Sequence, residues 1–394
     1  SQVEPGHCCP LTMTYASIPV IAAADHLATD WHRKLTARDY DRAIRPVAEK
    51  RAATLGMAMT EKQGGSDVRT NTTRAEPDGE NWRLTGHKWF CSAPMSDGFL
   101  TLAQTPKGLT CFLVPRWLEG ERNRIRIMRL KDKLGNRSNA SAEIEYDRTI
   151  APAGLMRAAL VEAHHWTQHR TAFQKHLIDQ PLMRRVLADL ALDWEGTLAL
   201  GMHVASAFDG TTEQDRAFAR IGVALSKFIA NKLCPMVVAE AMEVLGGMGY
   251  VEDTPLPMLY REAPLNGIWE GSGNVICLDA LRTLAKEPLA QLGLAAELDA
   301  ALGHNNRYDT ALREHRARWP SDPPESDARW FVERTALLLT ASIMLRQAPD
   351  AIADAFVATR LSGDRGRFCG AVGALECDRI LARLAPGEAV SHKP

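Results

Sequence analysis

The pattern of apolar residues changes at Pro152, and this change constrains the fold more than any other feature of the sequence. Between residues 81 and 146, short runs alternate apolar and polar residues and are separated by glycines, as β-strands are. We expect strands at residues 82–85, 99–104, 109–114 and 141–146. A series of short strands with turn signals between them predicts a compact antiparallel β domain.

After Pro152 the apolar residues recur at helical spacing. We expect long helices at residues 155–171, 181–208, 215–245, 275–285 and 330–345, and another near the N-terminus at residues 22–36. The sequence therefore predicts an α+β protein in which a β domain is followed by a helical bundle.

Composition narrows the class of protein further. The chain has 394 residues, of which 45% are hydrophobic and 24% charged, enough for two or three globular domains. Its 47 basic and 48 acidic side chains nearly cancel, so any site for nucleic acid or membrane has to be a local patch. The eight cysteines contain no CxxC pair and no metal-type spacing with histidine, which predicts buried thiols and no metal site. Without a signal peptide or an apolar run of about 20 residues, we expect a cytoplasmic protein.

The segment 58–67, Ala-Met-Thr-Glu-Lys-Gln-Gly-Gly-Ser-Asp, leads into the predicted strands. Two glycines, a hydroxyl and a carboxylate in one loop can bring backbone N–H groups and Ser66 close to a phosphate. A plain tight turn is the alternative interpretation of Gly-Gly-Ser alone.

Three further segments attract attention. Residues 86–92, Gly-His-Lys-Trp-Phe-Cys-Ser, carry Trp89 on a strand, where a tryptophan can also belong to an ordinary core. Residues 243–250, Glu-Val-Leu-Gly-Gly-Met-Gly-Tyr, can be a helix C-cap and turn. Residues 266–274, Asn-Gly-Ile-Trp-Glu-Gly-Ser-Gly-Asn, contain Glu270, which can alternatively be a carboxylate stabilised at a helix N-terminus.

These four segments, in this order, resemble the signatures of the acyl-CoA dehydrogenase superfamily, and the chain is most similar to its AidB-like branch. The Trp-Glu-Gly-Ser-Gly-Asn spelling, the long loop between Tyr250 and Arg261, and Leu-Tyr-Arg-Glu after it are typical of that branch. The resemblance implies a partial N-terminal helical domain, a central antiparallel β domain, a C-terminal helical bundle and the cofactor FAD.

The resemblance also assigns roles to individual residues. Glu270 occupies the position of the general base, which removes a proton α to a thioester and needs a pKa raised toward neutrality. Hydride then leaves the β carbon for flavin N5. The residues expected to contact the cofactor are Met59, Thr60, Gly65, Ser66, Trp89, Cys91, Ser92, Arg170, Phe173, Gln180, Glu243, Gly246, Gly247, Trp269, Gly271, Ser272 and Asn274.

Three of these residues, Arg170, Phe173 and Gln180, match a stretch through which family members reach the flavin of a neighbouring subunit. We therefore expect a homo-oligomer, a dimer or a homotetramer. The family normally has glycine after the phenylalanine, and this chain has Gln174, so the turn there can differ in shape.

We expect four parts: a remnant of the N-terminal helical domain at 1–55, the β domain at 56–150, the helical bundle at 151–290 and a further helical region at 291–394. Family members carry a helical stretch with substrate-facing residues after the β domain. Here residues 149–152 lead straight to the next predicted helix; if that helical stretch is deleted from the protein, one wall of the substrate cleft is missing.

Two functions remain open at this level. The first is an FAD-dependent acyl-CoA dehydrogenase acting on the CH–CH bond of a thioester. The second, implied by the AidB-like branch, is binding of double-stranded DNA in the response to alkylation damage, with weak or no dehydrogenase activity. Residues 283–394 contain 14 Lys and Arg against 15 Asp and Glu, so DNA binding requires a local patch, for which Arg282, Arg316 and Arg365 are the candidates.

Overall fold

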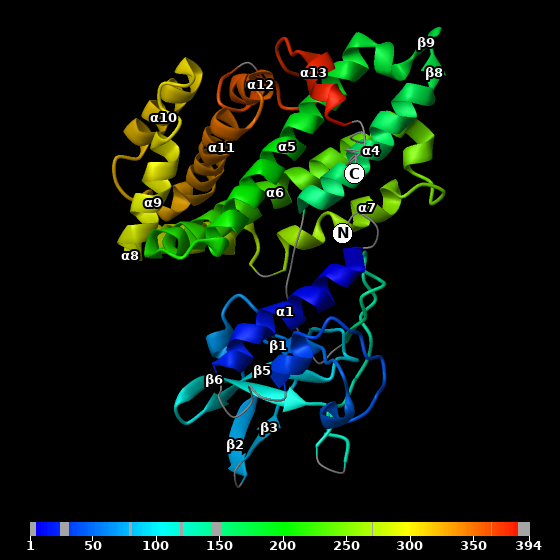
Figure 1. Cartoon of the computed structure of the whole chain (residues 1–394), viewed down its shortest axis with the longest axis vertical. Helices are drawn as coiled ribbons and strands as arrows, with labels where there is room; N and C mark the ends of the chain where they lie inside the picture. Colours follow the sequence, from blue (N-terminus) through cyan, green and yellow to red (C-terminus); the bar gives the residue numbers. More distant parts are fainter. Residues whose placement is uncertain are drawn as a thin grey trace, which may run out of the picture. The chain divides into compact units, whose positions relative to one another are not determined.

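The computed structural model describes residues 5–23, 31–78, 81–118, 121–142, 152–269, 271–363 and 365–384, and the chain forms two compact units (Figure 1). Unit 1 contains residues 3–151 together with Trp269–Gly271, and unit 2 contains Pro152–Ile268 and Ser272–Pro394. The chain thus leaves unit 1 at Pro152, where the apolar pattern changes. The finer division into four parts stays a prediction.

Unit 1 combines short helices with a small sheet. Its elements are α1 (Cys8–Ala22), α3 (Arg33–Leu35), β1 (Leu55–Ala58), β2 (Arg74–Asp78), β3 (Asn81–Thr85), β4 (Cys91–Ser92), β5 (Gly98–Thr105), β6 (Gly108–Pro115) and β7 (Ser141–Ala142). The structure confirms strands in three of the four expected regions, and only the start of the fourth lies within the described residues. Of the helix expected at 22–36, residues 24–30 lie outside the described residues, and α1 precedes it.

The sheet of unit 1 is mixed rather than purely antiparallel. β5 pairs antiparallel with β6 along its whole length, and β2 pairs antiparallel with β3. On its other edge β5 runs parallel to β1 and, at Gln104, to β2. The expectation of an antiparallel domain was wrong for β1, because the long connection from β1 to β5 allows the crossover that parallel strands need.

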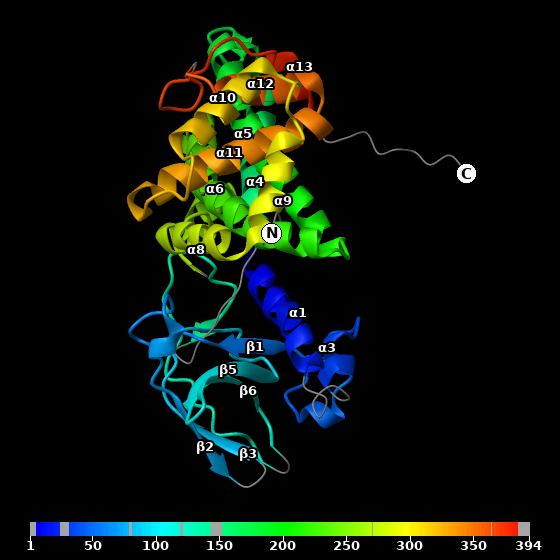
Figure 2. The same cartoon turned by 90° about the vertical axis from the view of Figure 1, so that its left-hand side faces the viewer.

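The core of unit 1 lies between α1 and the sheet. Both views show α1 beside β1 (Figures 1 and 2). Cys9, Met13 and Ile21 recur at helical spacing on the buried face of α1, and they pack with Leu55 of β1 and Phe99 of β5. Burial of this apolar face holds the helix on the sheet.

Unit 2 is helical apart from one short hairpin. Its elements are α4 (Pro152–His169), β8 (Thr171–Ala172), β9 (Lys175–His176), α5 (Pro181–Asp209), α6 (Glu213–Leu245), α7 (Leu256–Glu262), α8 (Gly273–Lys286), α9 (Pro288–Asp299), α10 (Asn306–Arg318), α11 (Ala328–Gln347), α12 (Asp350–Arg360) and α13 (Cys377–Ala382). All five helices expected after Pro152 are confirmed.

Helix α6 is the centre of unit 2. It begins at a capping box, in which Thr212 and Asp215 satisfy each other's backbone N–H groups, and it contacts α4, α5, α8, α9 and α11. By length and composition, Glu213–Gly249 could cross a membrane, but 61% of its most apolar window is buried inside the structure. That degree of burial is typical of the core helix of a globular unit.

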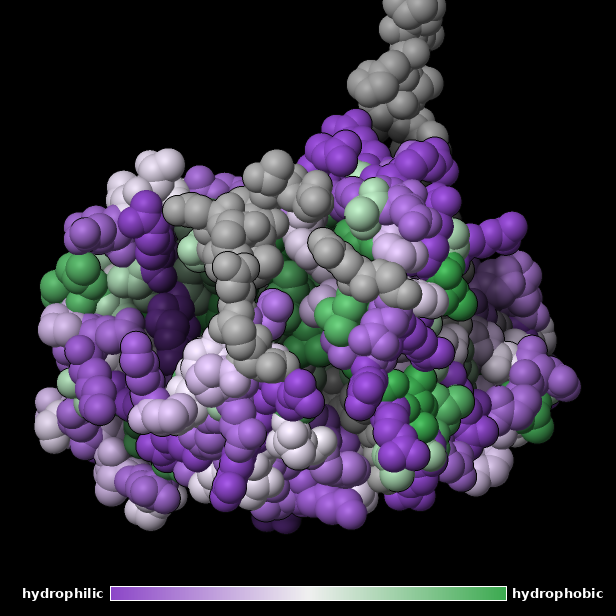
Figure 3. Space-filling model, turned by 90° about the horizontal axis from the view of Figure 1, so that it is seen from below, coloured by the Kyte–Doolittle hydropathy of each residue, from purple (hydrophilic) through white to green (hydrophobic). Residues whose placement is uncertain are grey.

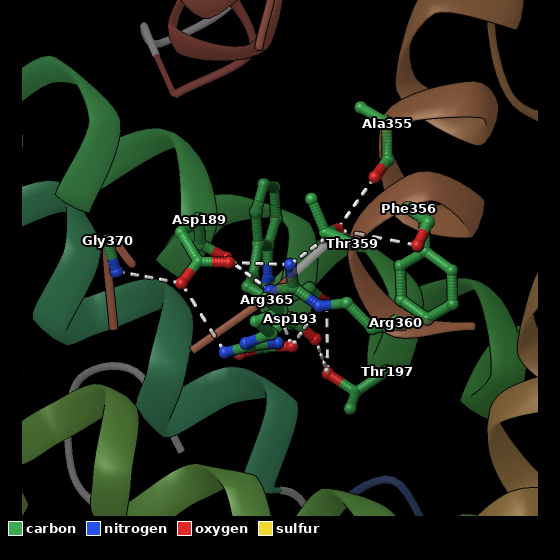
Figure 4. A network of polar contacts seen from close by, with 10 residues as sticks. Asp189, Asp193, Thr197, Ala355, Phe356, Thr359, Arg360, Arg365 and Gly370 are labelled. Carbon is green, nitrogen blue, oxygen red and sulfur yellow. Dashed lines mark hydrogen bonds and ion pairs between the residues drawn. The ribbon is translucent and has the colours of Figure 1, made fainter. Parts of the chain in front are cut away.

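A buried ionic network joins the last helices to α5 (Figure 4). Arg360 of α12 lies 2.5 Å from Asp189 Oδ1 and 2.7 Å from Asp193 Oδ1, and all three side chains are at most 3% exposed. Arg365 lies 3.3 Å from Asp189 Oδ2, and the backbone N–H of Gly370 donates to the same oxygen. Buried charges require partners of this kind, so the network anchors the segment after α12 to α5.

The surface seen in Figure 3 is mainly hydrophilic, and hydrophobic residues lie on it in small separate groups. Such scattered apolar residues are normal on the outside of a globular protein.

Candidate functional site

The loop after β1 is organised around a buried carboxylate. Glu61 is 2% exposed and accepts hydrogen bonds from the backbone N–H groups of Thr72 and Thr73, from both of their hydroxyls and from Lys88 Nζ at 2.9 Å. Burial by itself raises the pKa of Glu61, but these donors outweigh burial and lower that pKa to about 2. Glu61 is therefore ionised and fixes the path of the loop.

The predicted cofactor residues of this loop surround an exposed stretch of backbone. Met59 and Thr60 are half-buried, and their carbonyls accept from Asn71 Nδ2 and from the Trp89 N–H. Gly65 and Ser66 are exposed. A Cβ added to Gly65 would lie 2.7 Å from Thr60 Oγ1, so this close approach needs glycine. The loop thus presents main-chain donors of the kind that bind phosphate.

The prediction that Trp89 lies on a strand was wrong: it lies in the connection between β3 and β4, and only Cys91 and Ser92 of this group belong to a strand. Trp89 is half-buried, and Lys131 Nζ lies 3.3 Å from the centroid of its ring. Cys91 is fully buried in the core of unit 1. Ser92 is 6% exposed, and its hydroxyl lies 3.1 Å from that of Ser141. Trp89 is the member of this group that is partly exposed, and Lys131 lies over one face of its ring.

In unit 2, the end of α6 is open to solvent. Glu243, Gly246 and Gly247 are exposed, and a Cβ added to either glycine would meet no atom within 4 Å. Arg261 forms a bidentate ion pair with Glu252, at 2.6 and 2.9 Å.

The stretch 170–180 forms the β8–β9 hairpin and the turn after it. Phe173 is 92% exposed at φ 51°, and Gln174 follows it at φ 64°. Gln180 Nε2 donates to the Ala172 carbonyl, and the Leu177 N–H donates to the carbonyl of Arg170. The hairpin therefore holds a phenylalanine in solvent on a strained turn.

The predicted catalytic segment is described in part. Glu270 lies outside the described residues. Trp269 packs against the core of unit 1, whereas Ser272 is the N-cap of α8 in unit 2 and makes no side-chain capping bond. Gly271 lies at φ 102°, and Asn274 Oδ1 accepts from Arg329 Nη1 at 3.0 Å.

The three arginines proposed for DNA all lie beside carboxylates. Arg282 lies 3.6 Å from Asp279, Arg316 2.8 Å from Asp299, and Arg365 belongs to the buried network. The side chain of Arg365 is only 19% exposed, so its charge is already neutralised inside unit 2. Tertiary pairing of this kind leaves no signal in a sequence.

Sequence reasoning missed four residues at these places. Lys131 covers Trp89, Glu61 organises its loop, and Lys232 and Arg329 lie at the start of α8. Only Glu61 could have been found from the sequence, because it lies within the segment 58–67. The other three come from distant parts of the sequence.

The residues present fit a flavin dinucleotide. Exposed backbone donors at Gly65 and Ser66 and the uncapped N-terminus of α8 suit phosphate oxygens. The half-buried Trp89 can offer the ring face opposite Lys131 to an aromatic ring system. Among the described residues no cluster of metal-ligating side chains occurs.

Comparison with known sequences gives three family models in order along the chain. They are the adaptive response protein AidB N-terminal domain at residues 1–42, the acyl-CoA dehydrogenase middle domain at 56–149 and the acyl-CoA dehydrogenase C-terminal domain at 145–285. A putative acyl-CoA dehydrogenase AidB of Escherichia coli is 42% identical over 388 residues, covering 90% of this chain and 71% of that protein.

Solved structures agree with this assignment. Caenorhabditis elegans ACDH-11 in complex with C11-CoA is 26% identical, with a TM-score of 0.76, covering 95% of this chain and 70% of that one. A Bacillus anthracis acyl-CoA dehydrogenase complexed with FAD shares the fold, with a TM-score of 0.60 at 15% identity, over 77% of this chain and 65% of that one.

Proposed function

Because the chain belongs to the acyl-CoA dehydrogenase family, we propose that it is an FAD-dependent oxidoreductase that dehydrogenates an acyl-CoA thioester between its α and β carbons. FAD is the cofactor that family membership supports. The observation that carries the proposal is the loop around Glu61, which presents Gly65 and Ser66 ahead of Trp89 within the matched middle domain.

The chain's own residues supply positioning and proton transfer. When bound, FAD supplies the hydride acceptor. We assign Glu270 to remove the α proton, because it stands in the Trp-Glu-Gly-Ser segment of the matched C-terminal domain. The electrons of the α C–H bond form the new double bond as hydride leaves the β carbon. A carboxylate base in this role needs a raised pKa, which apolar surroundings favour.

The test is the visible spectrum of the purified protein under anaerobic conditions. We expect a bound oxidised flavin that is bleached by one class of acyl-CoA, and a Glu270→Gln variant that keeps the flavin band but is not bleached. The C11-CoA complex of the C. elegans protein makes medium- to long-chain thioesters the first to try. A protein purified without flavin, or one whose flavin no thioester reduces, would contradict the proposal.

We extend the proposal to a homo-oligomer, a dimer or homotetramer, in the cytoplasm. A phenylalanine that is 92% exposed on a strained hairpin favours a role at an interface between copies of the chain. The eight cysteines are free thiols, which favours a reducing compartment, but the prediction that they are buried was wrong for Cys8, Cys111, Cys369 and Cys377.

Binding of duplex DNA is the second candidate. It is favoured by exposed arginines on α10, among which Arg318 stacks on the half-exposed ring of Trp330 at 3.7 Å. Arg365 is unsuitable for the test, because reversing its charge would disrupt the buried network. We expect Arg313→Glu with Arg318→Glu to weaken duplex binding and reduce its salt dependence. If the double variant binds duplex DNA as tightly as the unmodified chain does, these arginines do not form the DNA-binding surface.

A further inference from the structure

Two lysines lie close to the ring of Trp89. Lys131 Nζ is 3.3 Å from the centroid of the indole, and Lys62 Nζ is 5.5 Å from it. Lys131 is half-buried, as Trp89 is, whereas Lys62 is exposed. An ammonium over the face of an indole is attracted by its π electrons, and the attraction is stronger where water is partly excluded. Lys131 is therefore the cation that acts more strongly on this ring.

Main-chain hydrogen bonds hold Lys131 and Trp89 in register with each other. The Lys131 N–H donates to the carbonyl of Ser141 at 2.7 Å, and Ser141 of β7 pairs with Ser92 of β4. Trp89 lies three residues before Ser92, and its N–H donates to the carbonyl of Thr60 at 3.2 Å. Since the backbone is anchored on both sides, the contact between the ammonium and the indole belongs to the framework of unit 1.

Two other lysines of unit 1 are directed to different partners. Lys88, next to Trp89 in the sequence, forms a buried ion pair with Glu61 at 2.9 Å, so the two charges balance each other. Lys133 Nζ donates to two main-chain carbonyls of its own loop, at 2.6 Å each. The charge of Lys131 is therefore the one that the fold places on the Trp89 ring.

We propose that Lys131 raises the reduction potential of the flavin, by placing its charge on one face of Trp89 while the flavin stacks on the other face. This inference rests on the proposed function, because it takes the aromatic ligand of Trp89 to be the flavin of FAD. Lys131 acts through Trp89 and is a positioning residue. Family membership does not assign it, because its effect depends on the tertiary contact of the two side chains.

The charge balance of the reaction gives the direction of the effect. A hydride from the β carbon brings two electrons and one proton to FAD, so the reduced flavin carries one more negative charge than the oxidised flavin. The α proton passes to the carboxylate of Glu270, which becomes neutral. A fixed positive charge behind the indole stabilises the reduced flavin more than the oxidised flavin. Lys131 therefore favours acceptance of the hydride.

The experiment measures the midpoint potential of the flavin in the full chain with FAD bound. Dithionite reduces the flavin in the presence of a reference dye, so the measurement involves no thioester and no turnover. Lys131→Met keeps an unbranched apolar side chain and removes the charge. We expect it to lower the equilibrium constant of two-electron reduction by about tenfold, which is about 30 mV.

Three further variants separate the charge from the packing of the side chain. Lys131→Arg keeps a cation over the ring and should stay within about threefold of the unmodified protein. Lys62→Met should lower the equilibrium constant by less than about threefold, because Lys62 is farther from the ring and its charge is screened by solvent. Lys107→Met, at an exposed position in the turn between β5 and β6, is the matched control and should leave the potential unchanged.

Two results would overturn the inference alone. If Lys131→Met and the unmodified protein have the same midpoint potential, the charge does not act on the flavin. If Lys131→Arg lowers the potential as much as Lys131→Met does, the side chain has only a packing role. Should Lys131→Met retain no FAD, Lys131→Gln is the second neutral variant, with the same expected change of about tenfold. Loss of FAD from both neutral variants would show that Lys131 supports the cofactor site as a whole, which also overturns the inference.

The proposed function fails in a different way. If the unmodified protein binds no FAD, the proposed function is wrong, and this inference is wrong with it. If the flavin is bound and its potential follows the charge at residue 131, but no thioester bleaches it, the inference is supported and the proposed function alone is contradicted.

Discussion

At the scale of single residues, the carboxylate of Glu61 determines how the flavin loop is built. Its charge is buried and is balanced by Lys88 and by donors from Thr72 and Thr73. The motif that suggests a phosphate loop therefore contains a residue whose role is structural. The donors that we propose for the ligand are the backbone groups of Gly65 and Ser66.

We predict that unit 1 loses stability in acid through Glu61. Because the pKa of Glu61 is lowered from 4.5 to about 2 in the folded chain, its contribution is complete above about pH 5 and disappears as the pH falls toward 2. The free energy of unfolding, measured by urea titration, should fall by about 3 kcal/mol over this range. In Glu61→Gln this part of the pH dependence should vanish, and the loop should be destabilised at neutral pH by about 3 to 5 kcal/mol, because Lys88 is left buried without a counter-charge. Glu76→Gln, at an exposed position, is the control. If it changes the pH dependence of stability as much as Glu61→Gln does, the pH dependence does not come from Glu61.

A second residue-scale prediction concerns the hairpin turn. Gln174 has φ 64°, a conformation that costs non-glycine residues energy. Gln174→Gly should raise the free energy of unfolding of unit 2 by about 1 kcal/mol, since the strain relieved exceeds the added chain entropy. The same change at Lys175, in β9, should destabilise instead. A loss of stability in Gln174→Gly would contradict the assigned strain.

At the scale of elements, α12 and the segment after it depend on α5 for their charge balance. Arg360 lies between two buried aspartates (Figure 4), so its removal leaves two buried carboxylates with the longer pairings to Arg365, at 3.3 and 3.6 Å. We predict that Arg360→Met destabilises unit 2 by about 3 to 5 kcal/mol and makes residues 361–384 sensitive to protease. Arg379→Met, which breaks an exposed pair with Glu376, should cost less than about 1 kcal/mol. If protease cleaves residues 361–384 equally slowly in the two variants, apolar packing alone holds this segment in place.

At the scale of the whole molecule, the hairpin of unit 2 provides the test of assembly. Phe173 is 92% exposed in one chain, so Phe173→Ser should change the free energy of unfolding of the isolated subunit by less than about 0.5 kcal/mol. If copies associate through this hairpin, the Phe173→Ser oligomer should dissociate at a higher protein concentration than the unmodified oligomer does. Light scattering after size exclusion measures this difference. Phe368→Ser, at a position 81% exposed in a different loop, is the matched control. Dissociation in the control alone would place the interface elsewhere.

Much of the architecture follows from the sequence alone. The periodicity of 2 and of 3.6 residues predicts the strands of unit 1 and the five long helices of unit 2, because one-sided burial imposes those periods on the pattern of apolar residues. The order of four signature segments predicts the family and its cofactor, because ligand-binding backbone needs particular residues at fixed local spacing.

Only the tertiary structure decides what distant residues do to one another. It makes β1 run parallel to β5, pairs Arg365 with Asp189, and brings Lys232 and Arg329 to the start of α8. None of these relations has a local pattern, since a charge acts on any neighbour within a few ångströms regardless of separation along the chain. Local chemistry was therefore predictable from the sequence, and the pairing of charges was determined by the fold.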